Sequence, residues 1–235
     1  MAKYKRVLIK ISGEALAAEK HTGYDFDFVM KVCGAVKKCA EKGVQVGIVI
    51  GGGNFWRGVK DGAGHVERVS ADRMGMLATA MNCLAVCDVF NQLGAKAKVM
   101  TAVDIQGVGE RYDTKKAIEY LENGIIVLFA GGSGMPFFST DTAAALRAAE
   151  IRADAILLAK NVDGVYSADP VKDPTAYKFD EISYDEVLAR RLAVMDTTAT
   201  SLAMDNDLPV IVFALADPEN IGRVVDGEKI GTTVS

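Results

Sequence analysis

The segment VQVGIVIGGGNFWR, residues 44–57, joins a strand pattern to a glycine run. Its first half is a near-continuous series of Val and Ile, which is typical of a strand buried on both faces of a parallel sheet. The series ends at Gly51, Gly52 and Gly53, whose backbone another molecule can approach closely because it carries no side chains. Amides at such a strand end can form an anion-binding nest, and Arg57 adds a planar fork that suits phosphate. A plain strand-to-helix turn has the same pattern, so this segment alone leaves both interpretations open.

A second strand with a glycine-rich exit follows further along the chain. Ile125 to Ala130 (IIVLFA) is apolar, and it continues directly into Gly131 to Asp141 (GGSGMPFFSTD). The helix expected at Thr142 to Ala149 would direct its N-terminus at the same place. Open α/β sheets bind ligands at the carboxyl ends of their strands. Two glycine exits at one sheet edge therefore predict a ligand that carries phosphate.

Strand and helix patterns alternate along the rest of the chain. Strands are expected at Tyr4 to Ile11, Lys96 to Thr101, Asp154 to Ala159, Pro209 to Ala214 and, at an edge, Thr232 to Val234. Helices are expected to begin at or near Asp25, Val69, Asp113, Ser183, Asp196 and Pro218. Val59 to Val66 is expected to be mobile, and an irregular segment is expected to reach Ile182. The alternation predicts an α/β fold with a mainly parallel sheet and helices on both faces.

Composition limits the possible functions. The chain has 235 residues, half of them hydrophobic, and 27 Lys and Arg against 31 Asp and Glu, a net charge of −4. Without a basic excess, nucleic-acid binding is not expected. Two histidines exclude a histidine-rich metal site, and four cysteines in apolar helical patterns, none in a CxxC, indicate reduced thiols in a cytoplasmic protein. We see neither a signal peptide nor an apolar run of membrane-spanning length, so no membrane partner is expected.

Two charged residues stand near the ligand edge of the expected sheet. Lys10 lies inside an otherwise apolar strand, where its ammonium needs a charged partner. The alternative is an edge strand with a solvated Lys10. Asp72 is expected in the first turn of the helix from Val69, where the helix dipole alone could explain a carboxylate.

The motifs of the commoner nucleotide-binding folds are missing from the sequence. It contains no GxxxxGK[ST], no GxGxxG after the first strand, no HRD or DFG set and no GxSxG. The remaining pattern is two glycine exits, Lys10, Arg57 and acidic residues at helix starts. Phosphoryl transfer requires mainly positioned anions and neutralised charge, which this set can supply.

Five motifs taken together resemble the bacterial-type UMP kinase family of the amino-acid kinase superfamily. The resemblance extends from the first strand to the GEKIGTTV tail, and five motifs in this order are more specific than any one of them. The motifs are KISGEAL (Lys10–Leu16), VIGGGNFWRG (Val49–Gly58), DRMGMLATAMN (Asp72–Asn82), GSGMPFFSTD (Gly132–Asp141) and NVDGVYSADP (Asn161–Pro170).

The resemblance implies a reaction and a fold. The expected reaction is transfer of the γ-phosphoryl of ATP to UMP with Mg²⁺ held mainly through the phosphates, by a pyrimidine-nucleotide biosynthetic enzyme. The expected fold is a three-layer αβα sandwich around a mainly parallel twisted sheet. A single domain, residues 1–235, would bind UMP mainly with its N-terminal part and ATP mainly with its C-terminal part.

Site residues follow from the resemblance, position by position. Lys10 would offset charge on the transferring group, and Asp72 would accept hydrogen bonds from the UMP ribose. Asp141 would organise Lys10, the metal-bound phosphates, or both, although an Asp at a helix start is equally a plain cap. The residues implied in catalysis are Lys10, Arg57 and Asp141. Those implied in ATP binding are Lys10, Ile11, Ser12, Gly13, Gly53, Arg57, Lys160, Asn161, Tyr166 and Asp169. Those implied in UMP binding are Gly52, Asp72, Ser133, Gly134, Met135, Pro136, Phe137, Phe138, Ser139 and Thr140.

The resemblance also implies a homohexamer that GTP activates and UTP inhibits. The stretch Ala18 to Gly23 (AEKHTG) departs from a more glycine-rich family sequence connected with the GTP response, which leaves that response open. Two rival functions remain. One is a related kinase acting on a carboxylate or carbamate, against which the GSGMPFFSTD loop and Asp72 argue. The other is a non-catalytic nucleotide sensor, which should have lost Lys10 or a glycine loop.

Overall fold

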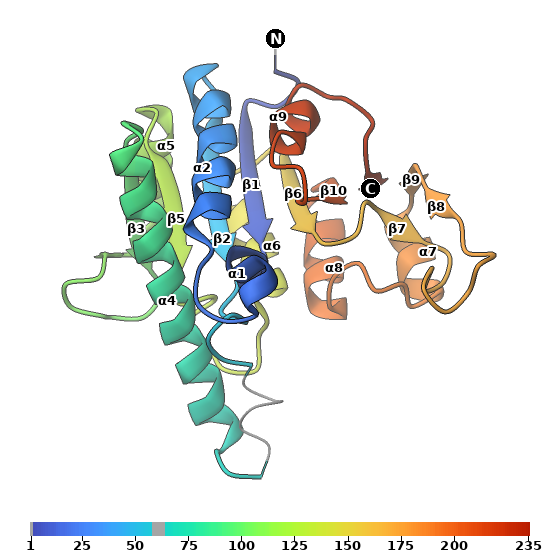
Figure 1. Ribbon diagram of the computed structural model, residues 1–235, viewed down its shortest axis with the longest axis horizontal. Coiled ribbons are helices and arrows are strands. Elements are labelled where there is room, and N and C mark those ends of the chain that lie inside the picture. Colours follow the sequence, from blue (N-terminus) through green and yellow to red (C-terminus); the bar gives the residue numbers. More distant parts are fainter. Residues whose placement is uncertain (1, 58–63) are drawn as a thin grey trace.

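A nine-stranded sheet forms the centre of the computed structural model, which describes residues 2–57 and 64–235 (Figure 1). Its strand order is β4-β3-β5-β2-β1-β6-β10-β11-β9. All strands from β4 to β10 in that order are parallel, whereas β11 and β9 run in the opposite direction. The strands are β1 (Arg6–Ile11), β2 (Gln45–Ile50), β3 (Ala97–Thr101), β4 (Glu110–Arg111), β5 (Ile126–Ala130), β6 (Ala155–Lys160), β9 (Glu181–Ile182), β10 (Val210–Ala214) and β11 (Thr232–Val234).

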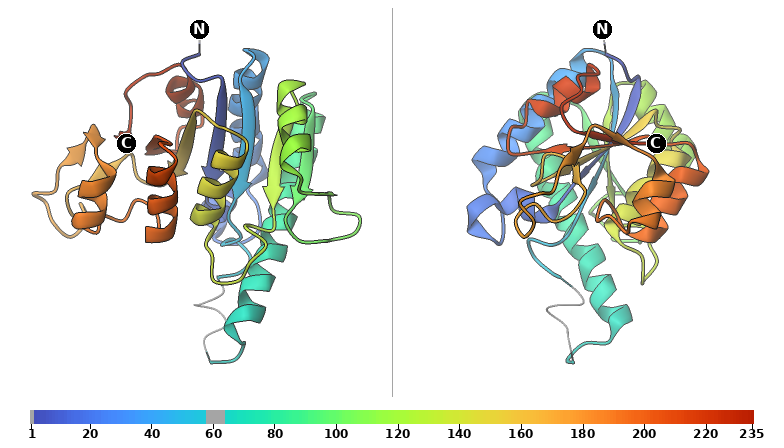
Figure 2. Two further views of the ribbon diagram at one scale, coloured as in Figure 1. Left: turned by 180° about the vertical axis from the view of Figure 1, so that it is seen from behind. Right: turned by 90° about the vertical axis from the view of Figure 1, so that its right-hand side faces the viewer.

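Helices cover both faces of this sheet (Figure 2), which confirms the three-layer αβα prediction. One layer contains α2 (Phe26–Glu41), α4 (Arg68–Gln92) and α9 (Asn220–Val225). The other contains α5 (Thr114–Glu122), α6 (Thr140–Glu150), α7 (Tyr184–Ala189) and α8 (Thr197–Asp205). The short helices α1 (Gly13–Ala17) and η1 (Ala18–Lys20) follow β1.

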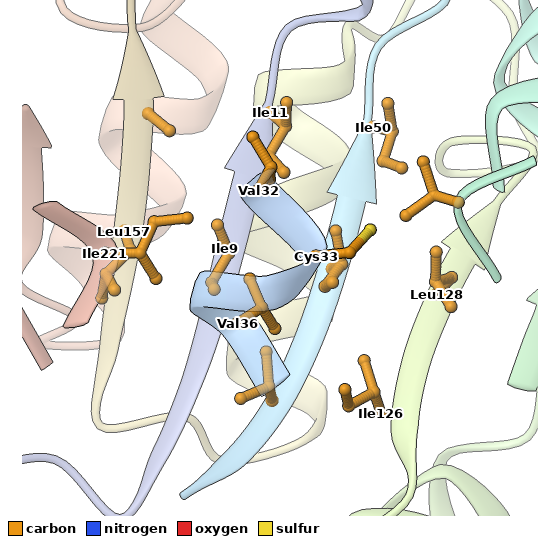
Figure 3. Packing of buried hydrophobic residues seen from close by; sticks show 14 of the residues in the cluster. Ile9, Ile11, Val32, Cys33, Val36, Ile50, Ile126, Leu128, Leu157 and Ile221 are labelled. Atoms are coloured by element: carbon orange, nitrogen blue, oxygen red, sulfur yellow. The ribbon is translucent and has the colours of Figure 1, made fainter. Parts of the chain in front are cut away.

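Alternation along β1 explains how both faces become buried. Ile9 and Ile11 pack with Val32, Cys33 and Val36 of α2 (Figure 3), whereas Leu8 faces the other cluster, which includes α6. Because successive side chains of a strand point to opposite faces, Lys10 lies on the same face as Leu8 and is directed toward α6.

Three details of the sheet differ from the expectations. β1 lies in the middle of the sheet between β2 and β6, so the edge-strand alternative for Lys10 is wrong. β11 is not the edge strand, because β9 pairs outside it. The segment expected to be irregular up to Ile182 contains a hairpin of β7 (Val165–Tyr166) and β8 (Lys178–Phe179), as well as β9.

Two expectations concern the segment around α4. Within Val59 to Val66, positions 58–63 lie outside the described residues, so the expected mobility is not tested there. Contrary to the sequence expectation, α4 is long and apolar enough to span a membrane by length and composition. In this fold it packs against α2, β3 and β5, and more than half of its apolar window is buried, as in a core helix.

Candidate active site

The order of the strands distributes the loops at the carboxyl edge of the sheet. β2 and β5 are neighbours, and both glycine exits therefore lie on one side of β1. β6 and β10 are neighbours on the other side of β1. Lys10, near the end of β1, thus lies between the two groups of loops. This arrangement places one cation between two possible binding regions.

The exits of β1 and β2 pack directly against each other. The Gly51 amide donates a hydrogen bond to the Ile11 carbonyl at 2.9 Å. A Cβ added at Gly13 would lie 2.3 Å from the Gly51 carbonyl oxygen, which no side chain can do. Close approach of two backbones therefore requires the glycine of the KISGEAL motif.

Two buried side-chain amides stabilise this glycine exit through hydrogen bonds. The side chains of Asn54 and Asn82 exchange hydrogen bonds of 3.1 and 2.8 Å, and both residues are almost completely buried. Asn82 also donates to the Gly51 carbonyl at 2.7 Å, and Asn54 donates to the Gly23 carbonyl at 2.9 Å. The pair joins the exit of β2 to α4 and to the segment that follows η1.

A cleft of about 170 Å³ lies between the exits of β2 and β5, and we call it the β2–β5 cleft. Of the residues expected to bind UMP, it contains Gly52, Asp72, Ser133, Met135, Phe138, Ser139 and Thr140. Sequence reasoning missed six further lining residues, four of them on α4; these are Trp56, Ala71, Gly75, Met76, Thr79 and Gly132. The repeat of small residues in GMLATA was the signal that could have revealed the α4 wall.

The exit loop of β5, residues 131–139, is fixed by polar contacts from α4. The Thr79 hydroxyl accepts a hydrogen bond from the Gly131 amide at 2.9 Å, and the Asp72 carboxylate accepts one from the Phe137 amide at 2.8 Å. Asp72 is the fifth residue of α4, one residue further into the helix than expected and just past its first turn, and it also pairs with Arg68 at 2.8 Å. The helix dipole therefore does not explain Asp72, since that effect is confined to the first turn.

Lys10 forms an ion pair across the site with Asp141. The ammonium lies 2.6 Å from Asp141 Oδ1, and both side chains are largely buried. The helix cap at this position is Ser139, whose hydroxyl accepts from the amides of Asp141 and Thr142. Asp141 is therefore not a plain cap, and its carboxylate is directed at the lysine of β1.

Lys160, at the end of β6, lies within electrostatic reach of this pair. Burial lowers the pKa of Lys160, while the Asp141 carboxylate opposes that effect and the Lys10 ammonium adds to it. Its ammonium donates to the carbonyls of Val194 and Ala193. The sequence predicts Lys160 at the adenine and ribose site; Lys160 lines the second cavity described below, and its charge is also felt by the Lys10–Asp141 pair.

Asp196 is a further polar residue at this centre, and sequence reasoning treated it as a helix cap alone. It does cap α8, accepting from the Ala199 amide at 3.0 Å. It also accepts hydrogen bonds from the hydroxyls of Ser139 and Thr142. The N-termini of α6 and α8 are thereby joined.

A second cavity of about 450 Å³ lies beyond β6, and we call it the β6–β10 cavity. It contains three residues expected to bind ATP, namely Lys160, Tyr166 and Asp169. Sequence reasoning missed the opposite wall, where Arg190 and Arg191 precede an apolar run; the wall comprises Arg190, Arg191, Leu192, Ala193 and Val194. The cavity is large enough to take part of a nucleotide, with cations along one wall.

Several expected residues line neither opening. Arg57 pairs with Glu14 at 3.0 Å, next to Gly53, on the rim of the β1 and β2 exits. The Ile11 side chain is in the core, so Ile11 can offer a ligand its backbone alone. The others are neighbours in sequence of residues that line the two openings or the space between them; they are Ser12, Gly13, Gly134, Pro136, Phe137 and Asn161.

Comparison with known proteins agrees with this arrangement. The model of the amino acid kinase family matches residues 5–214. A uridylate kinase of Streptococcus thermophilus is 53% identical over 234 residues, covering 99% of this chain and 96% of that protein. The chain belongs to the uridylate kinase family.

Solved structures of uridylate kinases share the whole fold. The UMP kinase of Bacillus anthracis superposes with a TM-score of 0.95 at 38% identity, covering 99% of this chain and 96% of that one. The UMP kinase of Ureaplasma parvum superposes with a TM-score of 0.93 at 35% identity, covering 99% of both chains. These full-length matches confirm the family and the fold predicted from the five motifs.

Proposed function

We propose that this chain is a UMP kinase, which transfers the γ-phosphoryl group of ATP to UMP and releases ADP and UDP. The observation that carries the proposal is the position of Lys10, which pairs with Asp141 between the β2–β5 cleft and the β6–β10 cavity. UMP would occupy the cleft and ATP the cavity, so that the transferring group lies between them. The 53% identity to a uridylate kinase supports this choice of substrates.

The chemistry needs alignment and charge neutralisation more than proton transfer. A phosphate oxygen of UMP forms a bond to the γ-phosphorus while the bond from that phosphorus to the β,γ-bridging oxygen breaks and ADP departs. The attacking oxygen is already anionic, so a strong general base is not required. Lys10 and Lys160 would stabilise the charge on the transferring group, with Asp141 holding Lys10 in place.

Magnesium would enter with the nucleotide. Among the described residues no cluster of three or more His, Cys, Asp or Glu could hold a metal ion by itself. The groups at the centre are ammonium ions and loop amides, which suit phosphate oxygens. Mg²⁺ bound mainly by phosphates, as expected from the resemblance, is compatible with this set; when bound it would neutralise phosphate charge.

We also propose that residues 1–235 act as one domain, divided by β1 into a mainly UMP-binding N-terminal part and a mainly ATP-binding C-terminal part. The β2–β5 cleft is formed by residues up to Thr140, and the β6–β10 cavity by residues from Lys160 onward. The two parts share a single sheet, in which β1 pairs with both β2 and β6.

We propose further that copies of the chain associate through α4 into a homo-oligomer, a hexamer by the family resemblance. On the outer face of α4, Met74, Leu77, Met81 and Leu84 are each 40–51% exposed. Their spacing of three and four residues forms one continuous stripe. Such a stripe suits burial against the same helix of a second copy. Sedimentation of a Leu77→Glu/Met81→Glu variant should show smaller particles than the wild type; an unchanged sedimentation coefficient would contradict this interface.

A coupled assay of ADP release with Mg²⁺ and ATP tests the function. UMP, CMP, acetylglutamate and carbamate are compared as acceptors, and selective turnover of UMP is expected. Turnover of an amino-acid substrate alone would refute the substrate, and ATP binding without turnover of any acceptor would favour a sensor. Adding GTP or UTP tests the expected effector responses.

The four cysteines form no disulfide, which fits the proposed cytoplasmic location.

A further inference from the structure

Arg147, on α6, is a buried arginine that lies outside both openings. The residue is 4% exposed, and it is absent from the linings of the β2–β5 cleft and the β6–β10 cavity. Its guanidinium contacts Glu150 Oε2 at 2.5 Å and lies 3.9 Å from the centre of the Tyr112 ring. Its other terminal nitrogen donates to the Gly132 carbonyl at 3.4 Å. One side chain thus joins α6, the segment before α5 and the exit loop of β5.

The stability of the fold does not by itself explain why an arginine is buried at this position. Burial of a charge is costly, and a buried ion pair can often be replaced by apolar residues without loss of stability. A methionine at this position would fill much of the same space among the alanines of α6. An apolar residue would lack the ion pair with Glu150 and the hydrogen bond to the Gly132 carbonyl, and of these the second reaches the exit loop of β5.

That hydrogen bond determines how the exit loop presents its backbone. Gly131 and Gly132 have φ values of +77° and +60°, so the chain turns sharply at the end of β5. In a trans peptide the carbonyl and the following amide point in opposite directions. Holding the Gly132 carbonyl toward Arg147 therefore directs the Ser133 amide away from Arg147. Gly132 and Ser133 both line the β2–β5 cleft, where an amide hydrogen can meet a phosphate oxygen.

Tyr112 and Glu150 hold the guanidinium in its position. The Tyr112 hydroxyl donates to the same Glu150 oxygen at 2.7 Å, and the Tyr112 ring packs edge-on against Phe129 of β5. Burial raises the pKa of Tyr112 to about 12, so the hydroxyl keeps its proton at neutral pH. The planar guanidinium bonds the Glu150 carboxylate with one terminal nitrogen and the Gly132 carbonyl with the other, a fixed fork that the single ammonium of lysine lacks.

We propose that Arg147 is a positioning residue for UMP: with Tyr112 and Glu150 it fixes the Gly132–Ser133 peptide so that the exit loop of β5 can bind the acceptor nucleotide. This inference rests on the proposed function, because it assigns a role at the same cleft. The inference predicts an effect on UMP binding and little effect on ATP binding, because Arg147 supports the wall of the cleft and does not line the β6–β10 cavity.

Steady-state kinetics of Arg147→Lys test the inference, with Arg152→Lys as the matched control. Arg152 is exposed and follows the same helix, so its exchange should leave both KM values unchanged. Arg147→Lys should raise KM for UMP about tenfold, or ~1.4 kcal/mol, and change KM for ATP less than about twofold. Tyr112→Phe keeps the ring and should raise KM for UMP less than Tyr112→Leu, which removes the ring.

Two outcomes would overturn the inference. One is an unchanged KM for UMP in a folded Arg147→Lys variant, and the other is an equal rise in both KM values, which a general loss of structure would cause. Should Arg147→Lys fail to fold, as judged by its thermal melt, Tyr112→Leu is judged by the same two criteria. Wild-type turnover of UMP is measured first, so failure of the proposed function is recognised separately from failure of the positioning role.

Discussion

Both β2 and β5 end in glycine runs, but the two runs are required for different physical reasons. Gly51, Gly52 and Gly53 lie outside the left-handed region, and an added Cβ at Gly52 would lie 2.9 Å from the Ala78 Cβ. The second run has the opposite character. Gly131, Gly132 and Gly134 all have positive φ values, and Gly132 has open space around its missing Cβ. Gly52 is needed for close packing and Gly132 for backbone conformation, whereas Gly131 and Gly134 combine positive φ with close neighbours.

The supports of the two exits also differ. The first is held by buried amides, Asn54 and Asn82, which bond the backbone directly. The second is also bonded at its backbone, by the Thr79 hydroxyl and by two charged side chains, Asp72 on α4 and Arg147 on α6. A glycine run at a strand end therefore predicts a place where a ligand can approach the backbone, but the run alone does not reveal whether close packing or positive φ requires the glycines.

The largest expected effect comes from removing Lys10, which lies between the two exits. Lys10→Ala should lower kcat by about 10²–10³-fold, because a preorganised charge at the transferring group is lost. The substitution also leaves the largely buried Asp141 carboxylate without its ion-pair partner, so a thermal melt is measured beside kcat to establish that the variant is folded. Lys38→Ala, at an exposed ion pair with Glu219, is the control. A Lys10→Ala enzyme within threefold of wild-type kcat would show that the charge is not needed.

Asn82→Ala tests the rigid support of the first exit. It would remove the donor to the Gly51 carbonyl and to Asn54 Oδ1 in a buried place, which should cost about 2–3 kcal/mol of unfolding free energy. Urea unfolding measures the loss, and Gln92→Ala at the exposed end of the same helix should cost far less. A loss equal to that of Gln92→Ala would mean that the amide pair adds nothing to the first exit.

Substitutions at Gly52 and Gly132 test whether the two glycines are required for different reasons. Gly52→Ala should destabilise by about 1–3 kcal/mol and raise KM for UMP, because the methyl group meets α4. Gly132→Ala should cost about 1–2 kcal/mol, since strain at positive φ is its main consequence.

Asparagine distinguishes the two sites further. It tolerates positive φ, so Gly132→Asn should be milder than Gly132→Ala, whereas Gly52→Asn should be worse than Gly52→Ala. Thermal melts of the four variants give the order directly. The same order at both positions would show that the two runs do not differ in this way.

The sequence was sufficient to predict the layers of the fold because its strands are short apolar runs with clear ends. Val46 to Ile50 and Ile126 to Ala130 could be recognised without any tertiary information. Strand order could not be predicted in the same way, because nothing in the local sequence of β11 reveals that β9 pairs outside it. Helix starts were predicted well where a cap exists, as at Asp25 and Asp113.

The candidate site could be predicted where motifs are contiguous, and less well where the contact is made across the sheet. Asp72 and Ser133 to Thr140 could be assigned to one ligand by resemblance, and most of them line one cleft. The charge environment of Lys160 depends on Lys10 of β1 and Asp141 of α6, which the local sequence does not encode. Arg147 carried no local signal, because an arginine on an alanine-rich helix is usually a surface residue.

The smallest expected effect concerns pH and separates the donor side from the acceptor side. Because burial lowers the pKa of Lys160 below 10.5, this ammonium should lose its proton before an exposed lysine does. As pH rises through that lowered pKa, kcat/KM for ATP should fall, whereas Lys160→Arg should remove the decline because arginine stays charged.

The free energy of unfolding should change in the opposite direction. Between the lowered pKa and 10.5 the unfolded chain binds more protons than the folded one, so the contribution of Lys160 to stability rises with pH. Activity and urea stability measured from pH 7 to 10.5 check both signs, and an alkaline decline that persists unchanged in an active Lys160→Arg enzyme would assign it to another group.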